Sequence, residues 1–195
     1  MTDALPEKTR AMMLTIRLGT VADAAILADF ATTSFQDAFG DDNRPEDLAL
    51  HLARSYGPRQ QEAELGDSAI TTLLAEDADR LAGYAQVRPG APPPCVAPDG
   101  ALELWRFYVG RPWHGRGVAQ ALMARVVAVA RARGARTLWL GVWERNQRAQ
   151  GFYRKVGFQR VGGQTFMVGT DPQSDHVMAL SLATVKPGGA PGTSE

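Results

Sequence analysis

The spacing of apolar positions changes once in the first quarter of the chain, from a period of two residues to a helical period. Over Leu14–Leu18 apolar and polar residues alternate, which is the pattern of a half-buried strand. Thr20 can then cap a helix, whose apolar residues recur from Val21 to Phe39. The polar residues 40–43 interrupt this run, and Pro45 can start a further helix. The pattern predicts one strand followed by two helices.

Two short apolar segments come next, at residues 69–75 and 81–87. The polar break between them has the length of a hairpin turn, so we expect two antiparallel strands. Residues 89–100 contain three consecutive prolines, and proline has no N–H group to donate to a neighbouring strand. We expect this last segment to be an exposed loop.

The second half of the chain opens with a strand, a long amphipathic helix and a second strand, at residues 102–109, 117–133 and 137–143. Two strands joined through a helix form a parallel pair with a right-handed crossover, and ligands bind at the carboxyl ends of such strands. A short helix is expected at residues 148–155. The pattern therefore places a ligand crevice just after the first of these two strands.

A final hairpin, with strands at residues 158–168 and 177–182, completes the pattern. The whole pattern is that of one α/β domain, which we expect to span residues 11–184. Residues 1–10 are expected to be a flexible N-terminus. Residues 185–195, which are rich in glycine and proline, are expected to be a disordered tail.

The composition favours a globular protein with a small-molecule partner. Of 195 residues, 45% are hydrophobic and 22% are charged, and the formal net charge is +0. This balance removes the bulk attraction on which binding to nucleic acids and anionic membranes depends, so we expect neither partner. Cys95 is the only cysteine, which excludes an internal disulfide framework. Because no secretory signal or apolar span of about 20 residues is visible, we expect a cytoplasmic protein, with a homodimer left open.

The turn before the long helix carries the candidate chemistry. It reads His114-Gly115-Arg116-Gly117-Val118-Ala119. Glycines let a backbone approach a ligand closely, and the start of a helix presents unpaired N–H groups and a positive dipole end. Such a turn suits a pyrophosphate, although the same glycines also fit a plain tight turn. The phosphate loops of nucleoside triphosphatases and of dinucleotide folds have other spacings, so a different anion is expected.

This turn resembles the Gln/Arg-x-x-Gly-x-Gly/Ala segment of the GCN5-related N-acetyltransferases, with His114 in the Gln/Arg position. Residues 146–158 are similar to the family's next signature and read Asn-x-x-Ala-x-x-Phe-Tyr-x-x-x-Gly-Phe. The resemblance implies the family's α/β fold, with a mixed, mostly antiparallel central sheet flanked by helices. Its fourth and fifth strands, here residues 102–109 and 137–143, are expected to splay apart and admit the pantetheine arm of coenzyme A.

By the same resemblance, the protein transfers the acetyl group of acetyl-coenzyme A (acetyl-CoA) to a primary amine of a small molecule or peptide, by direct attack in a ternary complex and without a metal. The residues that the resemblance assigns to cofactor binding are Phe107, Val109, His114, Gly115, Arg116, Gly117, Val118, Ala119, Asn146 and Phe152. Asn146 has an alternative role as the N-cap of the helix that follows. Two other functions stay open: a non-catalytic acyl-CoA sensor, and an interaction module in which the glycines only form a turn.

Two residues are candidates for catalysis. Glu103 matches the place where some family members keep a general base, and simple alternation puts it on one side of its strand with Trp105, Phe107 and Val109. The alternative for Glu103 is an ion pair or a solvated carboxylate, with ordered water moving the proton. Tyr153 corresponds to the family tyrosine that meets the departing sulfur, where it stabilises the thiolate first and protonates it second. The alternative for Tyr153 is an aromatic residue of the core.

The acceptor amine is the part that the sequence leaves open. The acidic run from Asp37 to Asp47 can favour a cation or simply be solvated, and polyamine, amino acid, aminoglycoside and protein N-terminus are all retained. The three histidines are too scattered to predict a metal site. Cys95 has no neighbouring histidine or helix N-terminus to activate it, so a covalent acyl-enzyme is not expected.

Overall fold

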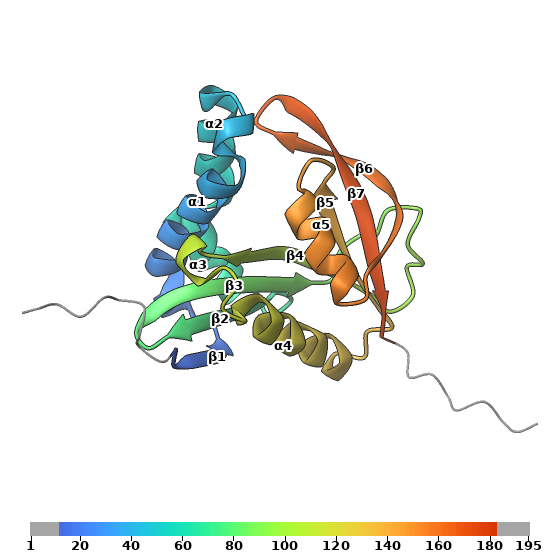
Figure 1. Cartoon of the computed structure of the whole chain (residues 1–195), viewed down its shortest axis with the longest axis horizontal. Helices are drawn as coiled ribbons and strands as arrows, with labels where there is room; N and C mark the ends of the chain where they lie inside the picture. Colours follow the sequence, from blue (N-terminus) through green and yellow to red (C-terminus); the bar gives the residue numbers. More distant parts are fainter. Residues whose placement is uncertain (1–11, 183–195) are drawn as a thin grey trace, which may run out of the picture.

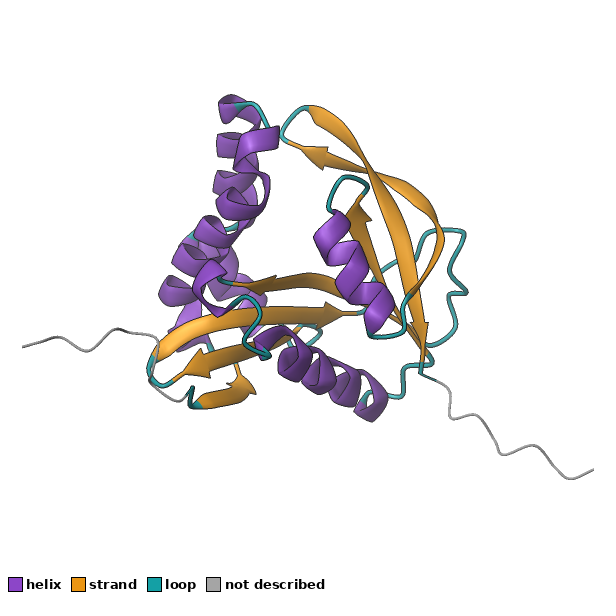
Figure 2. Ribbon diagram, viewed as in Figure 1, coloured by secondary structure: helices purple, strands orange, loops and turns teal. Residues whose placement is uncertain are grey.

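The computed structural model describes residues 12–182, so the expected flexible residues 1–10 and the tail 185–195 lie outside it. One seven-stranded sheet has the strand order β1-β2-β3-β4-β5-β7-β6 and is flanked by helices (Figures 1 and 2). The strands are β1 (Leu14–Leu18), β2 (Thr71–Asp77), β3 (Arg80–Arg88), β4 (Ala101–Val109), β5 (Thr137–Trp143), β6 (Gln159–Val168) and β7 (Asp171–Ser181). The helices are α1 (Ala24–Phe39), α2 (Pro45–Ser55), α3 (Pro58–Gly66), α4 (Val118–Ala132) and α5 (Gln147–Lys155).

Strands β4 and β5 separate soon after they meet. They are the parallel pair of the sheet, and their pairing runs only from Ala101 with Thr137 to Glu103 with Trp139. Every other neighbouring pair of strands is antiparallel. Beyond Glu103 the two strands point apart, as Figure 1 shows for β4 and β5. The mixed, mostly antiparallel sheet with splayed fourth and fifth strands is therefore confirmed.

A β-bulge interrupts the alternation of β4. The register with β3 passes from the pair Val87–Leu104 to the pair Gln86–Arg106, which leaves Trp105 as an extra residue. An extra residue shifts every later side chain of a strand to the opposite face. Even-numbered residues before the bulge and odd-numbered residues after it therefore face the same side of the sheet.

The bulge overturns one sequence prediction about β4. Leu104 packs in the core under α4, and Phe107 and Val109 pack against that same core. Glu103 precedes Leu104 by one residue and so points to the other face of the sheet. The expectation that Glu103 shares a side with Phe107 and Val109 is wrong, because simple alternation cannot foresee the bulge.

Two hydrophobic cores cover the two faces of the sheet. Burial of a large apolar side chain contributes roughly 1.5–3 kcal/mol each, so both cores hold the sheet in place. Under α4 the fully buried members include Leu73, Val87, Leu122, Val126 and Leu140. Against α1 and α2 the core includes Leu27, Phe35, Tyr56, Leu74 and Tyr84.

Helix α3 was not expected from the sequence, which predicted two helices before β2. It has Pro58 in its first turn and ends at Gly66. Its buried side chains are the polar Gln61 and Glu64, so it lacks the apolar stripe that makes a helix visible in a sequence. The segment between β1 and β2 thus contains three α-helices rather than two.

Two other segments differ in part from the prediction. Strand β7 begins at Asp171 rather than at residue 177, because the polar residues 171–176 pair with β6 along a hairpin that is half exposed. The segment 89–100 contains neither helix nor strand, as expected, yet Val96 within it is buried against Trp139 and Val177. Within residues 12–182 no helix is both long and apolar enough to span a membrane.

Candidate active site

The gap between β4 and β5 opens into a cavity of about 1150 Å³. The starts of α4 and α5 line it on the side of the α4 core, and α1, α2 and the β6–β7 hairpin line it on the other side. We call these the α4 side and the α1 side of the cavity. A volume near 1000 Å³ is large for a single small ligand, so the cavity has room for two reactants.

The glycine turn lies on the α4 side. Gly115 and Gly117 have φ angles of +75° and +86°, which other residues rarely adopt. The first hydrogen bond of α4 runs from the N–H of Ala121 to the carbonyl of Gly117. The preceding amides of the first helical turn, those of Val118 and Ala119 among them, therefore have no partner within the helix and are available to an anion.

His114 fixes the position of this turn. Its Nε2–H donates to the carbonyl of Val109 at 2.8 Å, and its Nδ1 accepts from Nη1 of Arg148 at 2.8 Å. Together these contacts connect the turn to the end of β4 and to the start of α5. The contacts of the side chain point to a positioning role in addition to the predicted contact with cofactor.

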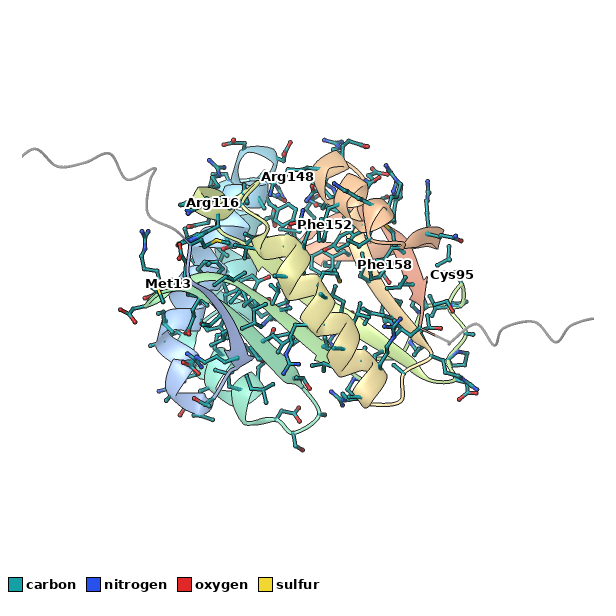
Figure 3. The ribbon with its side chains drawn as sticks, turned by 60° about the horizontal axis from the view of Figure 1, so that its bottom comes forward. Met13, Cys95, Arg116, Arg148, Phe152 and Phe158 are labelled. Carbon is teal, nitrogen blue, oxygen red and sulfur yellow. The ribbon has the colours of Figure 1, made fainter. Side chains whose placement is uncertain are left out.

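Most of the predicted cofactor residues reach the cavity, and two do not. Its lining includes Phe107, Val109, His114, Gly115, Gly117, Ala119, Asn146 and Phe152. The side chain of Val118 is fully buried in the core, so only its backbone can serve a ligand. Arg116 is exposed and outside the lining, and Figure 3 shows it just before α4.

Tyr153 lies on α5 inside an aromatic cluster that borders the cavity. Its ring centroid is 6.3 Å from that of Phe107 and 5.6 Å from those of Phe152 and Phe158. Within residues 12–182 its hydroxyl makes no hydrogen bond. Burial raises the pKa of the phenol well above its ordinary value, so the hydroxyl stays protonated and can act as a donor.

Asn146 is the N-cap of α5. Its Oδ1 accepts a hydrogen bond from the N–H of Ala149 at 3.0 Å, as the capping interpretation predicts. Asn146 also lines the cavity, where its side-chain amide N–H groups are free of the capping contact. The cap and a contact with cofactor are therefore compatible.

Glu103 stands on the α1 side, where β4 and β5 begin to part. Its Oε2 accepts from Nε of Arg88 at 2.7 Å, so the ion-pair interpretation of this residue is confirmed. The guanidinium of Arg88 lies 3.6 Å from the ring centre of Trp105. The guanidinium of Arg106 lies 4.0 Å from the same ring centre. The negative charge of Glu103 is thus already balanced at the edge of the cavity.

A buried ion pair that the sequence did not reveal supports the floor of the α1 side. Arg106 pairs with Glu64 of α3, and it also donates to Oε1 of Gln86 at 2.9 Å and to the carbonyl of Ser55 at 3.0 Å. These contacts join β3, β4, α2 and α3. A buried charge pair is stable only when its remaining hydrogen-bonding groups are satisfied, as they are here.

The wall of the α1 side is aromatic. The ring of His51 on α2 stacks on Phe35 of α1 at 4.5 Å and meets the edge of Phe166 of β6 at 5.7 Å. Burial, and next the charge of Arg106, lower the pKa of His51, so its imidazole is neutral at pH 7. The three rings give the cavity an apolar wall.

Helix α2 and the β6–β7 turn close over the cavity, and Figure 1 shows them side by side. Oδ1 of Asp47 accepts from the N–H of Thr170 at 2.8 Å and from its hydroxyl at 2.7 Å. Nε2 of Gln173 donates to Oδ1 of Asn43 at 2.6 Å. The end of the acidic run therefore holds the fold together, while Asp37 at its start lines the cavity and accepts from Arg111.

No metal site or cysteine nucleophile is found among the described residues. Residues 12–182 contain no group of three His, Cys, Asp or Glu side chains that could hold a metal ion. Cys95 is exposed and lies against Gly162 of β6, outside the cavity lining. Figure 3 shows it far from Arg116 and the start of α4.

Residues 30–158 match the model of the acetyltransferase (GNAT) family. The chain belongs to the GNAT family. An uncharacterized N-acetyltransferase of Mycobacterium tuberculosis is 35% identical over 162 residues, which cover 83% of this chain and 99% of the relative. Family and relatives together identify this GNAT protein as an N-acetyltransferase.

Solved structures agree with the GNAT fold. The PaiA N-acetyltransferase of Thermoplasma acidophilum, solved with coenzyme A, has a TM-score of 0.72 at 19% identity and covers 87% of this chain and 99% of its own. A Salmonella typhimurium protein solved with acetyl-CoA has a TM-score of 0.62 at 20% identity, with 93% and 99% covered. These likenesses confirm the fold class of the chain.

Proposed function

We propose that this protein transfers the acetyl group of acetyl-CoA to a primary amine, by direct attack of the amine while both reactants are bound. The observation that carries the proposal is the meeting of three features in one cavity: the glycine turn before α4, the unpaired edges of β4 and β5, and Tyr153. That two structures of this fold hold coenzyme A or acetyl-CoA supports the same co-substrate here.

The residues present fit the two ends of acetyl-CoA. The turn from Gly115 to Ala119 offers backbone N–H groups to its pyrophosphate. Beyond the pair of Glu103 with Trp139, the facing edges of β4 and β5 lack each other as partners. Backbone groups without partners require a hydrogen-bonding ligand or water, and the amide-bearing pantetheine arm can satisfy them.

Tyr153 is proposed to stabilise the thiolate that leaves when the C–S bond breaks. An ordinary phenol with a pKa near 10 facing a thiol near 8.5 already makes proton transfer uphill by about 1.5 units. Burial raises the pKa of Tyr153 further, which makes transfer less favourable still. A hydrogen bond from the hydroxyl to the developing thiolate is therefore the better role.

The amine must lose a proton before it attacks, and this requires a base on the α1 side. Glu103 is the carboxylate that the sequence proposes for this role, and it remains a proposal. Its Oε2 is already engaged by Nε of Arg88, so an amine would have to compete with that ion pair for the carboxylate. Cys95 lies outside the cavity, which supports direct transfer over an acyl-enzyme.

Thermal unfolding with and without acetyl-CoA, combined with thiol release in the presence of primary amines, tests the proposal. Acetyl-CoA at 100 times its dissociation constant should add about 2.7 kcal/mol to the free energy of unfolding. NAD⁺, which has a pyrophosphate but no pantetheine arm, serves as the control and should add much less. If acetyl-CoA does not stabilise the protein, the two glycines only form a tight turn and the proposal fails. If it stabilises the protein but no amine-dependent thiol release occurs, the protein is a sensor rather than an enzyme.

A further inference from the structure

A carboxylate that the sequence analysis did not single out stands over β5 inside the cavity. Asp175 of β7 is in register with Trp143 of β5 and with Gln164 of β6, so these side chains share one face of the sheet. Gly141 lies two residues before Trp143 and presents no side chain on that face. A Cβ atom placed on Gly141 would lie 2.9 Å from Oδ2 of Asp175. The carboxylate therefore occupies the space left by the missing side chain.

This position coincides with the point where the strands part. Glu103 and Trp139 form the last pair between β4 and β5, and Gly141 is the next residue of β5 that faces the α1 side. Asp175 thus stands on one arm of the splay and Glu103 on the other, both on the face away from the α4 core. Both carboxylates line the cavity that opens between the two strands.

The two carboxylates differ in their partners. Glu103 is paired with Arg88, whereas the side chain of Asp175 has no hydrogen bond or ion pair within residues 12–182. Glu144, just beyond β5, repels the carboxylate of Asp175. Across the cavity, α1 and α2 contribute Asp37, His51 and Arg54 to the lining.

Desolvation of this carboxylate, helped by Glu144, raises the pKa of Asp175 to about 6. At pH 7 it is therefore mostly ionised yet holds a proton more readily than an ordinary aspartate. A half-buried anion without a protein partner is stabilised by a cationic ligand. A base whose pKa is close to the working pH is also suited to proton transfer.

We propose that Asp175 receives the ammonium group of the acceptor and takes a proton from it, and that the acceptor is a cationic primary amine on an apolar body packed against Phe35, His51 and Phe166. This inference rests on the proposed function and names its substrate class. The wall formed by these three rings is apolar and uncharged at pH 7, because the imidazole is neutral. It therefore suits an apolar chain or ring better than a polyol or a second cation.

The proton balance of the step is complete with acetyl-CoA as the co-reactant. The ammonium gives one proton to the Asp175 carboxylate, which later passes it to water. The nitrogen lone pair forms the C–N bond, and the C–S bond breaks as the tetrahedral adduct collapses. The second proton of the nitrogen ends on the coenzyme A sulfur. The products are the amide, coenzyme A thiol and one released proton.

The test compares Asp175→Asn with a matched control, Asp171→Asn, on the same strand. Asp171 accepts from Nε2 of Gln173 at 3.0 Å and lies outside the cavity lining. The measurements are thiol release with 2-phenylethylamine and hexylamine, calorimetric binding of 2-phenylethylamine to protein saturated with coenzyme A, and the Kd for acetyl-CoA. We expect Asp175→Asn to lower kcat/KM about 100-fold and to weaken amine binding, with the Kd for acetyl-CoA unchanged. For Asp171→Asn, the kcat/KM, the amine affinity and the Kd for acetyl-CoA should each stay within about twofold of the wild-type value.

A second variant tests the position of the carboxylate rather than its charge. In Gly141→Ala, the new Cβ would lie 2.9 Å from Oδ2 of Asp175 and 2.6 Å from Nε2 of Gln164, so both flexible ends must move. We expect a similar loss of kcat/KM for the amine. This variant keeps Asp175 itself, so a loss here cannot come from an asparagine that fails to fold.

The outcomes separate this inference from the proposed function. If wild-type protein acetylates the amines and Asp175→Asn does so equally well, the role of Asp175 is overturned and the proposed function stands. If wild-type protein binds acetyl-CoA but neither binds nor acetylates the two amines, the assigned substrate class is overturned. If acetyl-CoA does not bind at all, the proposed function fails together with the inference.

Discussion

The Oε2 atom of Glu103 lies 2.7 Å from Nε of Arg88, on the face of β4 opposite to Phe107. An acceptor amine would have to compete with this guanidinium for the carboxylate, so Glu103 is poorly placed to receive the amine. The amide of glutamine would keep a hydrogen-bond acceptor for Arg88. We therefore expect Glu103→Gln to lower kcat/KM less than about tenfold near pH 7, or less than about 1.4 kcal/mol in barrier.

The pH profile of Glu103→Gln distinguishes a base from a bystander. A defect in proton removal recovers as alkaline pH supplies free amine, whereas a defect in folding or cofactor binding does not. A loss near 100-fold that recovers at alkaline pH would make Glu103 the base and contradict the smaller role argued here. The measurement is kcat/KM against pH for the variant and the wild-type protein.

Tyr153→Phe should lower kcat and leave the Kd for acetyl-CoA nearly unchanged. Charge develops on sulfur only in the transition state, so a donor to that sulfur contributes there and not in the ground state. Loss of such a donor costs about 2–4 kcal/mol, or roughly 30-fold to 1000-fold in rate. The ring contacts with Phe107, Phe152 and Phe158 survive the change, so thermal stability should not fall. A phenylalanine variant at full speed would exclude this role.

The parts of the fold that the sequence predicted are those in which local pattern and buried face coincide. Helix α4 carries a regular apolar stripe, and strands β4 and β5 are short runs rich in apolar residues, so the predicted bounds of all three agree with the structure to within a residue or two. Helix α3 was not predicted because its buried face carries the polar residues Gln61 and Glu64. Their partners, Ser55 and Arg106, belong to other elements. Polar contacts between distant segments leave no hydrophobic periodicity in the sequence of the helix.

The site shows the same division. The glycine turn and Tyr153 were predicted because each belongs to a contiguous signature. The bulge at Trp105 was not, since it arises from the register of β3 against β4 and not from β4 alone. Asp175 was missed because its significance depends on Gly141, a residue of another strand whose missing side chain makes room for it. The sequence could have indicated Asp175 only if the strand pairing that brings it next to a glycine had been known.

Gly117→Val should abolish acetyl-CoA binding, whereas His114→Ala should weaken it only moderately. A β-branched residue at φ +86° is strained by about 1–3 kcal/mol and would distort the amides at the start of α4. Loss of the imidazole removes the contacts with Val109 and Arg148 but leaves the backbone of the turn in place. The measurement is the Kd for acetyl-CoA of both variants and of the wild-type protein. Thermal unfolding of the free proteins serves as a control for folding. A histidine variant more damaging than the valine variant would contradict binding through the backbone.

Asp175→Asn should make the protein more stable above pH 6 while making it a poorer enzyme. The pKa of Asp175 is raised from 3.8 to about 6 in the folded protein, so between these values the folded state binds more protons than the unfolded state. Stability therefore falls as pH rises through this window, and the full cost of the buried charge is present above about pH 6. After allowance for solvent screening of a carboxylate that is partly exposed, this cost is about 1–2 kcal/mol.

Asparagine has no charge to desolvate, so the advantage of the variant should be absent below about pH 4 and complete above about pH 6. Denaturant unfolding of both proteins at pH 4, 5, 6 and 8 measures it, with Asp171→Asn as the control for loss of an aspartate from the same strand. A carboxylate kept only for the fold would show the reverse, with the asparagine variant less stable at pH 8. A gain in stability together with a loss of kcat/KM is the combination expected of a charge that is held unpaired for a cationic substrate.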